Sequence, residues 1–279
     1  MAYYTKVMVP LDGSPFAEAV LPWASAVARQ SGVRLTLLRV AEGAAEAEEV
    51  GRYLDAKAAS LGGEAQVLRA LGGVAATILA AVNAEPSTLC AITTHGRGGV
   101  LEVALGSVAR DVVGGALCPV VLYRPPGGQV AEYAPAPWLG SIVAALDGSE
   151  FSERVLGHAA ALAESLNLRL TIVQVVAPGQ VPAKADVLES SYVSGQAARL
   201  RRGSALDVDF EVLHGEAGHA LVDFVRSRPG ALLAMSSHAR PGLARTVLGS
   251  TTMACIRHAG LPVLVLGPAG VPATPVPAA

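Results

Sequence analysis

The sequence predicts an α/β fold: two tandem doubly wound domains, each with a parallel sheet of five strands and four helices. Short apolar runs alternate with longer helical patterns, which is typical of a parallel sheet covered by helices on both faces. The whole pattern occurs twice, and 279 residues are enough for two domains that each bury a core. The hydrophobic share of 52% excludes a disordered chain.

An internal repeat defines the two copies. The run Leu11-Asp12-Gly13-Ser14 recurs as Leu146–Ser149, an offset of 135, and Val40 aligns with Val175 at the same offset. In the later part of each copy the offset is 143, with these alignments: His95 with His238, Gly106-Ser107 with Gly249-Ser250, and Pro119-Val120 with Pro262-Val263. The change from 135 to 143 indicates a single gap, with eight extra residues between Val175 and Asp207.

The repeat also sets the domain boundaries. The first domain covers residues 1–124 and the second covers residues 139–267. Between them, residues 125–138 (PPGGQVAEYAPAPW) have the composition of an extended, semi-rigid linker. Residues 268–279 contain too much proline and too little apolar bulk to pack, so we expect a disordered tail.

Each element of the first copy follows from a local pattern. Continuous apolar runs predict buried strands over Lys6–Leu11, Arg34–Val40, Glu64–Leu71, Thr88–Thr93 and Pro119–Tyr123. The helical patterns between them predict helices over Pro15–Gln30, Ala45–Leu61, Val74–Asn83 and Ser107–Ala116. The second copy repeats this order. In such sheets, ligands bind beyond the carboxyl ends of the strands, where the strand order reverses.

Composition narrows the function classes. The net charge of −2, the absence of a basic run and the 4% aromatic content argue against a nucleic-acid surface. No apolar run approaches the roughly 18 residues of a membrane span, and the N-terminus enters a strand pattern without a signal-peptide shape. The odd, widely separated Cys90, Cys118 and Cys255 fit neither a disulfide framework nor a zinc site. We expect small buried thiols in a reducing compartment, the cytoplasm.

The segment Thr94–Arg110 (THGRGGVLEVALGSVAR) carries the clearest chemical signal. Glycines follow a predicted strand, and Gly106-Ser107 opens a helix. Glycines allow a close approach of the backbone to a ligand, and a helix N-terminus offers unpaired N–H groups to a phosphate. Ser107 can cap the helix or turn its hydroxyl toward a phosphate oxygen. An ordinary glycine loop with a capped helix is the alternative.

These residues resemble the universal stress protein family. Its ATP-binding members carry Gly, two residues, Gly, nine residues, and then Gly-Ser or Gly-Thr. Here Gly96, the spacer Arg97–Leu105 and Gly106-Ser107 match, while Thr93 stands at the first glycine. The resemblance spans nearly all of both copies. It implies the strand order 3-2-1-4-5, which places the ends of strands one and four side by side.

The resemblance also implies a nucleotide site in the first copy. Asp12 would accept hydrogen bonds from ribose hydroxyls or adenine, and Val40 would line the base pocket; a simple turn role for Asp12 is the alternative. The full set of expected contacts is Pro10, Leu11, Asp12, Val40, Thr94, His95, Gly96, Arg97, Gly99, Gly106, Ser107 and Val108. The expected ligand is ATP, with Mg²⁺ as an accompanying option.

The second copy departs at the loop. Ala239 replaces Gly96 and resists a positive φ, and Pro241 replaces Gly98 and has no N–H to donate. Asp147 and Gly249-Ser250 are retained. The retained residues around an altered loop predict a degenerate site.

The remaining histidines and arginines have structural alternatives. Each histidine of the pair His95 and His238 could contact a phosphate or make a local hydrogen bond. Each arginine of the pair Arg97 and Arg240 could contact a phosphate or lie in solvent. The spacing of five between His214 and His219 misses the geometry of helical metal ligands, so we expect a strand-to-helix connection there. We read His158 and His258 as helix residues.

The sequence therefore predicts a cytoplasmic stress-response protein that binds ATP in its first domain, with a regulatory or protective role. Two alternatives stay open: slow ATP hydrolysis or autophosphorylation on Ser107, and a scaffold that binds no nucleotide. The sequence contains no P-loop, complete dinucleotide fingerprint or specific catalytic triad. We also expect the apolar fifth strands to pair within one chain as a pseudo-dimer, with a homodimer as a further option.

Overall fold

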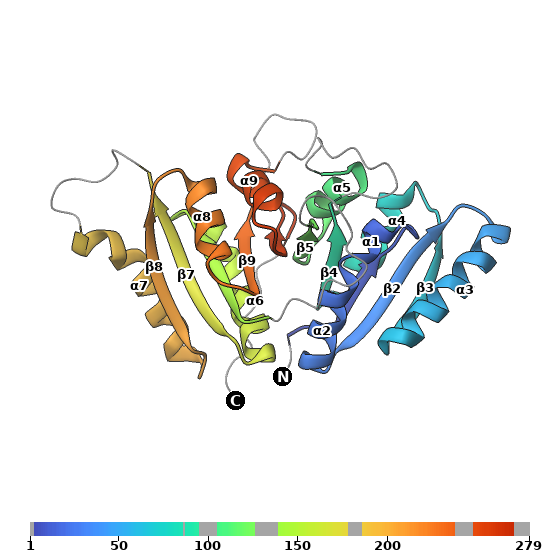
Figure 1. The fold of residues 1–279 in the computed structure, drawn as a ribbon, viewed down its shortest axis with the longest axis horizontal. Helices are drawn as coiled ribbons and strands as arrows, with labels where there is room; N and C mark the ends of the chain where they lie inside the picture. The colour runs from blue at the N-terminus through green and yellow to red at the C-terminus, as the bar shows by residue number, and fades with distance from the viewer. Residues whose placement is uncertain are drawn as a thin grey trace.

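The computed structural model describes residues 3–85, 87–94, 105–125, 139–177, 186–237 and 248–270. Within these ranges, ten strands form one continuous sheet in the order β3-β2-β1-β4-β5-β10-β9-β6-β7-β8 (Figure 1). Helices cover both faces of this sheet, as the alternating pattern of the sequence predicts. The fold class is therefore confirmed.

The first half contains strands β1 to β5 and helices α1 to α5. The strands are β1 (Lys6–Pro10), β2 (Arg34–Ala41), β3 (Glu64–Arg69), β4 (Thr88–Thr93) and β5 (Val120–Tyr123). The helices are α1 (Pro15–Glu18), α2 (Leu21–Ser31), α3 (Ala44–Leu61), α4 (Val74–Asn83) and α5 (Ser107–Gly115). These bounds agree with the predicted strands and with three of the predicted helices to within two residues.

The second half repeats the same order. Its strands are β6 (Ser141–Leu146), β7 (Arg169–Val176), β8 (Val208–His214), β9 (Ala231–Ser236) and β10 (Val263–Leu266). Its helices are α6 (Glu150–Leu166), α7 (Asp186–Gly203), α8 (Ala217–Arg226) and α9 (Ser250–His258). His158 lies in α6 and His258 ends α9, so both are helix residues as predicted.

Each half has the expected strand order. The strands within a half are parallel, and the first half runs 3-2-1-4-5 while the second presents the same order reversed. The two fifth strands pair antiparallel across the middle, with Val263 opposite Leu122 and Leu264 opposite Val121. The edge that each half would expose is thus covered by the other half.

Two buried clusters of apolar side chains lie on the two faces of the sheet. Helices α1, α2, α3, α6 and α7 cover one face, and α4, α5, α8 and α9 cover the other (Figure 1). Alternate residues of β2 enter the two clusters, Leu37 on the first face and Leu38 on the second. Strands buried on both sides explain the continuous apolar runs in the sequence.

The prediction of a single helix over Pro15–Gln30 is wrong, because the helix is interrupted between α1 and α2. Pro22 has no N–H to donate, and its ring would clash with the carbonyl of Glu18, four residues earlier, where α1 ends. The repeat places Gly157 at the matching position of the second half, at the offset of 135. There α6 continues unbroken over 17 residues.

The prediction that one gap separates the alignments of the two copies is also wrong. Thr36 pairs with Glu64 in the first half, but its counterpart Thr171 pairs with Asp209, so the offset between β3 and β8 is 145. It returns to 143 at the first residues of α4 and α8. Ten extra residues therefore precede β8, and the connection after β3 is two residues longer in the first half. Between the second and third strands, the two copies share too few identical residues for the sequence alignment to show two separate length differences.

Helices α2 and α6 pack against each other where the halves meet. The hydroxyl of Tyr4 lies 2.9 Å from Nδ1 of the fully buried His158. The Gln30 amide donates to the carbonyl of Leu166, the last residue of α6, over 2.7 Å. These two contacts, of which only the one between Tyr4 and His158 is buried, help to fix the relative placement of the two helices.

The predicted linker and tail lie mostly outside the described residues. Of the tail, residues 268–270 are described, and the Gly270 carbonyl accepts a hydrogen bond from Arg154. Among the helices that the structure describes, none is both long enough and apolar enough to cross a membrane.

Candidate functional site

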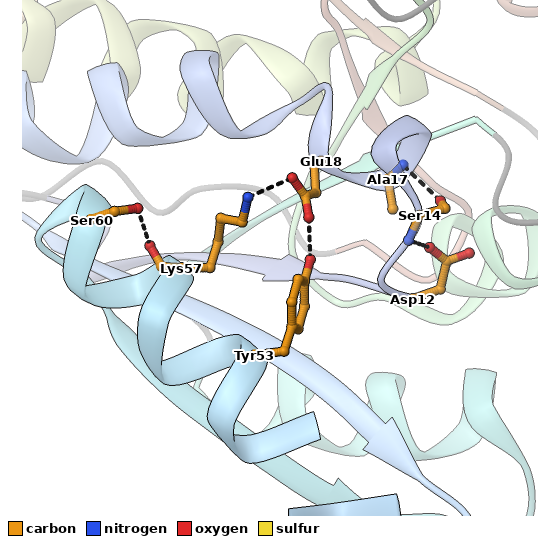
Figure 2. Close-up of polar contacts among 7 residues, drawn as sticks. All are labelled: Asp12, Ser14, Ala17, Glu18, Tyr53, Lys57 and Ser60. Carbon is orange, nitrogen blue, oxygen red and sulfur yellow. Dashed lines mark hydrogen bonds and ion pairs between the residues drawn. The ribbon is translucent and has the colours of Figure 1, made fainter. Parts of the chain in front are cut away.

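The turn after β1 places Asp12 at the carboxyl edge of the sheet. Oδ1 of Asp12 accepts a hydrogen bond from the Ser14 N–H over 2.9 Å, and Gly13 takes a positive φ of 79° (Figure 2). Ser14 caps α1, because its hydroxyl oxygen accepts from the Ala17 N–H over 3.1 Å. The predicted turn role of Asp12 is thus present, and a half-buried carboxylate can accept further hydrogen bonds.

The sheet register brings predicted contact residues to one level. Pro10 pairs with Leu38, and Asp12 and Val40 each follow this pair by two residues. Met8 pairs with Cys90, and Asp12 and Thr94 each follow that pair by four residues. Neighbouring strands are about 4.8 Å apart. This level is the point where the strand order reverses, because β1 lies between β2 and β4.

The N-terminus of α5 faces the same edge. Gly106 is the N-cap in an extended conformation, and within the described residues no side chain caps the helix. Its N–H donates to the Thr94 carbonyl over 2.7 Å, which ties the start of α5 to the end of β4. Ser107 is therefore the first helical residue and is exposed; it does not provide the N-cap. Val108 follows, half-buried.

The other expected contacts divide into two groups. Pro10 and Leu11 are buried behind the Asp12 turn, and the Leu11 N–H donates to the Leu38 carbonyl over 2.8 Å. His95, Gly96, Arg97 and Gly99 belong to residues 95–104, which lie outside the described part of the chain. Their role stays a prediction.

A polar cluster behind the turn was not predicted. The Tyr53 hydroxyl donates to Oε1 of Glu18 over 2.5 Å, and Nζ of Lys57 lies 2.7 Å from Oε2 (Figure 2). The Arg39 guanidinium carbon lies 5.8 Å from the centre of the Tyr53 ring. Burial, followed by the hydrogen bond to Glu18, raises the pKa of Tyr53. The alignment of Glu18 with Glu153 in the repeat was the available sequence signal.

Comparison with known proteins decides the family. The model of the universal stress protein family matches residues 3–124 and again residues 139–267, which together make up most of the chain.

The chain belongs to the universal stress protein family.

Its relatives include two proteins of Mycobacterium tuberculosis. Universal stress protein Rv1996 is 29% identical over 160 residues, which cover 48% of this chain and 50% of that protein. The chain thus spans about half the length of that relative. Universal stress protein Rv2005c is 24% identical over 290 residues, which cover 93% of this chain and 96% of that protein.

Solved structures share the fold over nearly the whole chain. A universal stress protein from Archaeoglobus fulgidus superposes with a TM-score of 0.69 at 20% identity, over 94% of this chain and 98% of that one. A functionally unknown protein of Pseudomonas aeruginosa gives a TM-score of 0.67 at 18% identity, over 95% and 93%. At these identities the likeness establishes the fold.

The second half of this universal stress protein retains the turn aspartate and the glycine at the start of the helix that define the site in the first half. Oδ1 of Asp147 accepts the Ser149 N–H over 2.9 Å, as Asp12 does for Ser14. The Gly249 N–H, at the start of α9, donates to the Ser237 hydroxyl over 3.1 Å. The loop with Ala239 and Pro241 lies outside the described residues.

The segment from His214 to His219 is a strand-to-helix connection, as predicted. His214 ends β8, and Glu216 caps α8 by accepting from the Gly218 and His219 N–H groups. The hydrogen bond from the His219 N–H is the main cause that lowers the pKa of Glu216. Within the described ranges, no three potential ligands gather as a metal site.

Proposed function

We propose that this universal stress protein binds an adenine nucleotide at the carboxyl edge of its first half. The observation that supports the proposal is that Asp12, Val40 and the start of α5 all lie at the carboxyl edge of the sheet, where the strand order reverses. A carboxylate, an apolar residue and a helix N-terminus match the ribose, the base and the phosphates of such a ligand.

The residues at the site fit ATP. Gly106, the N-cap of α5, has no side chain that could satisfy the N–H groups of the first helical turn, and such groups favour a phosphate. Asp12 would accept from the ribose or the base, and Val40 would pack against the base. The remaining contacts, His95, Gly96, Arg97 and Gly99, would complete a backbone cradle for the phosphates, which can carry Mg²⁺ with them.

The role that we propose is regulatory or protective. Ser107 is exposed on the first turn of α5, which favours autophosphorylation as the second candidate function. A scaffold that binds no nucleotide is the third. All three are compatible with residence in the cytoplasm, where the buried cysteines would stay reduced.

The two halves form, in this proposal, an intramolecular pseudo-dimer. Residues 1–124 would be the nucleotide-binding domain, 125–138 the linker, 139–267 the degenerate domain and 268–279 the tail. The antiparallel pairing of β5 with β10 supports this division, because it gives each half the same environment in the central sheet.

One experiment tests the function directly. The freshly purified full chain is denatured, and the released small molecules are identified by mass spectrometry. We expect adenine nucleotide near one equivalent per chain, and single-turnover incubation with labelled ATP then separates binding from hydrolysis or transfer to Ser107. A chain that is released empty and shows no calorimetric response to ATP would favour the scaffold.

A further inference from the structure

Helix α1 is very short and is anchored by side-chain contacts to another helix. It has a single turn, and the break at Pro22 separates it from α2. Two local backbone hydrogen bonds belong to this turn, from the Glu18 N–H to the Ser14 carbonyl and from the Ala19 N–H to the Phe16 carbonyl. In the second half, the matching turn is the start of the continuous helix α6.

The side chain of Glu18 anchors this short helix to α3. Its two carboxylate oxygens are bound by different residues, Oε1 by Tyr53 and Oε2 by Lys57 (Figure 2). Tyr53 packs against the buried cluster, and Lys57 and Glu18 are only partly exposed. Hydrogen bonds to a charged carboxylate are among the strong ones in proteins.

From Glu18 a short chain of contacts leads to Asp12. The backbone of Glu18 bonds to Ser14, and the Ser14 N–H is held by the Asp12 carboxylate. The charge of Asp12 also contributes to raising the pKa of Tyr53, which indicates that the two groups lie within electrostatic range. A shift of α3 against α1 would therefore displace the Asp12 turn.

The second half contains a looser version of the same arrangement. The Tyr192 hydroxyl lies 3.0 Å from Oε1 of Glu153, compared with 2.5 Å for Tyr53 and Glu18. Arg199 lies 3.6 Å from Glu153 and is 58% exposed, whereas Lys57 lies 2.7 Å from Glu18 and is 33% exposed. The tighter contacts occur where the helix has no continuation to support it.

We propose that Tyr53 and Lys57 are positioning residues of the nucleotide site: through Glu18 they hold α1 and the Asp12 turn in the geometry that receives the ribose. The inference rests on the proposed function and adds a determinant of its affinity. It places this determinant on α3, outside the residues that we propose as nucleotide contacts.

The test compares Tyr53→Phe with the matched variant Tyr192→Phe in the full chain. Both remove one hydroxyl from a tyrosine-glutamate pair, and calorimetry measures the affinity for ATP and for AMP. Tyr53→Phe is expected to weaken ATP about 3- to 10-fold, the scale of a residue that touches no ligand but supports one that does. AMP, which shares the ribose, should weaken by the same factor. Tyr192→Phe should leave both affinities unchanged.

Thermal unfolding of both variants shows whether each chain remains folded at the titration temperature. Unchanged ATP affinity in Tyr53→Phe would overturn the positioning role while leaving the proposed function intact. An equal loss in Tyr192→Phe would also overturn it, since a general softening of the fold would then explain both. A wild-type chain that binds neither ATP nor AMP would overturn the proposed function and this inference together.

Discussion

At the scale of single residues, Asp12 serves the backbone as well as any ligand. Its carboxylate holds the Ser14 N–H at the start of α1, and the repeat contains the same contact between Asp147 and Ser149. The turn role and the ligand role are therefore not exclusive. The conserved turn in the second half supplies a control that separates them.

We predict that Asp12→Ala weakens ATP binding about 10- to 150-fold, because a hydrogen bond to a charged group contributes roughly 1.5–3 kcal/mol. Calorimetry on the full chain measures this loss. Asp147→Ala removes the equivalent turn contact and should leave the ATP affinity unchanged. If Asp12→Ala binds ATP as the wild type does, Asp12 is a turn residue alone.

At the scale of elements, the amino end of the sheet depends on an ion pair. Nζ of Lys6, at the start of β1, lies 2.9 Å from Glu85 in the connection between α4 and β4. The Lys6 side chain is only 8% exposed, so this ammonium group needs a partner. The hydrogen bond from Lys6 holds the pKa of Glu85 below its usual value of 4.5.

We predict a pH-dependent effect of Glu85→Gln. A carboxylate with a lowered folded-state pKa stabilises the fold above its usual pKa, and this contribution is lost as the pH falls through the lowered value. Because Glu85 is half exposed, screening limits the loss at pH 7 to roughly 0.5–1 kcal/mol of unfolding free energy. Urea unfolding measures the difference in unfolding free energy between the wild type and Glu85→Gln. This difference should be smaller below about pH 4 than at pH 7. Glu48→Gln, at an exposed position on α3, is the control; the same loss at both pH values would contradict the pair.

At the scale of the whole molecule, the two halves share the same turn and helix start around the site but differ in the loop between them. Both halves retain the turn aspartate and an extended glycine before the helix, Gly106 or Gly249. The second half differs by Ala239 and Pro241, which would remove space and one N–H donor from a phosphate cradle. Two such defects would weaken a site by about two decades or more.

We therefore predict one ATP site per chain, located in the first half. Gly106→Val should abolish binding, because its side chain would stand at the start of α5. Gly249→Val should leave binding unchanged, and the fold should tolerate it, since a Cβ there would meet no heavy atom of the described residues within 4 Å. Calorimetric stoichiometry decides the matter. Two equal sites, or loss of binding through Gly249→Val alone, would place the nucleotide in the other half.

The sequence by itself determined most of the elements and the duplication, and the family resemblance that it carries implied the strand order. Apolar runs mark buried strands because both faces of this sheet are covered, and the repeated LDGS run marks the same turn twice. These signals are local or follow from the family resemblance, so a single chain contains them in full. Asp12, Val40 and Gly106 were selected as candidate contacts in this way, and their role toward a nucleotide stays a prediction.

Only the tertiary structure decided which distant side chains meet. Pro22 is a local signal for the end of α1, and the prediction of one helix over Pro15–Gln30 missed it. The Tyr53–Glu18 contact joins residues 35 apart on two helices, and the Tyr4–His158 contact joins residues 154 apart across the two halves. No local pattern encodes such pairs, because they depend on the relative placement of whole elements in space.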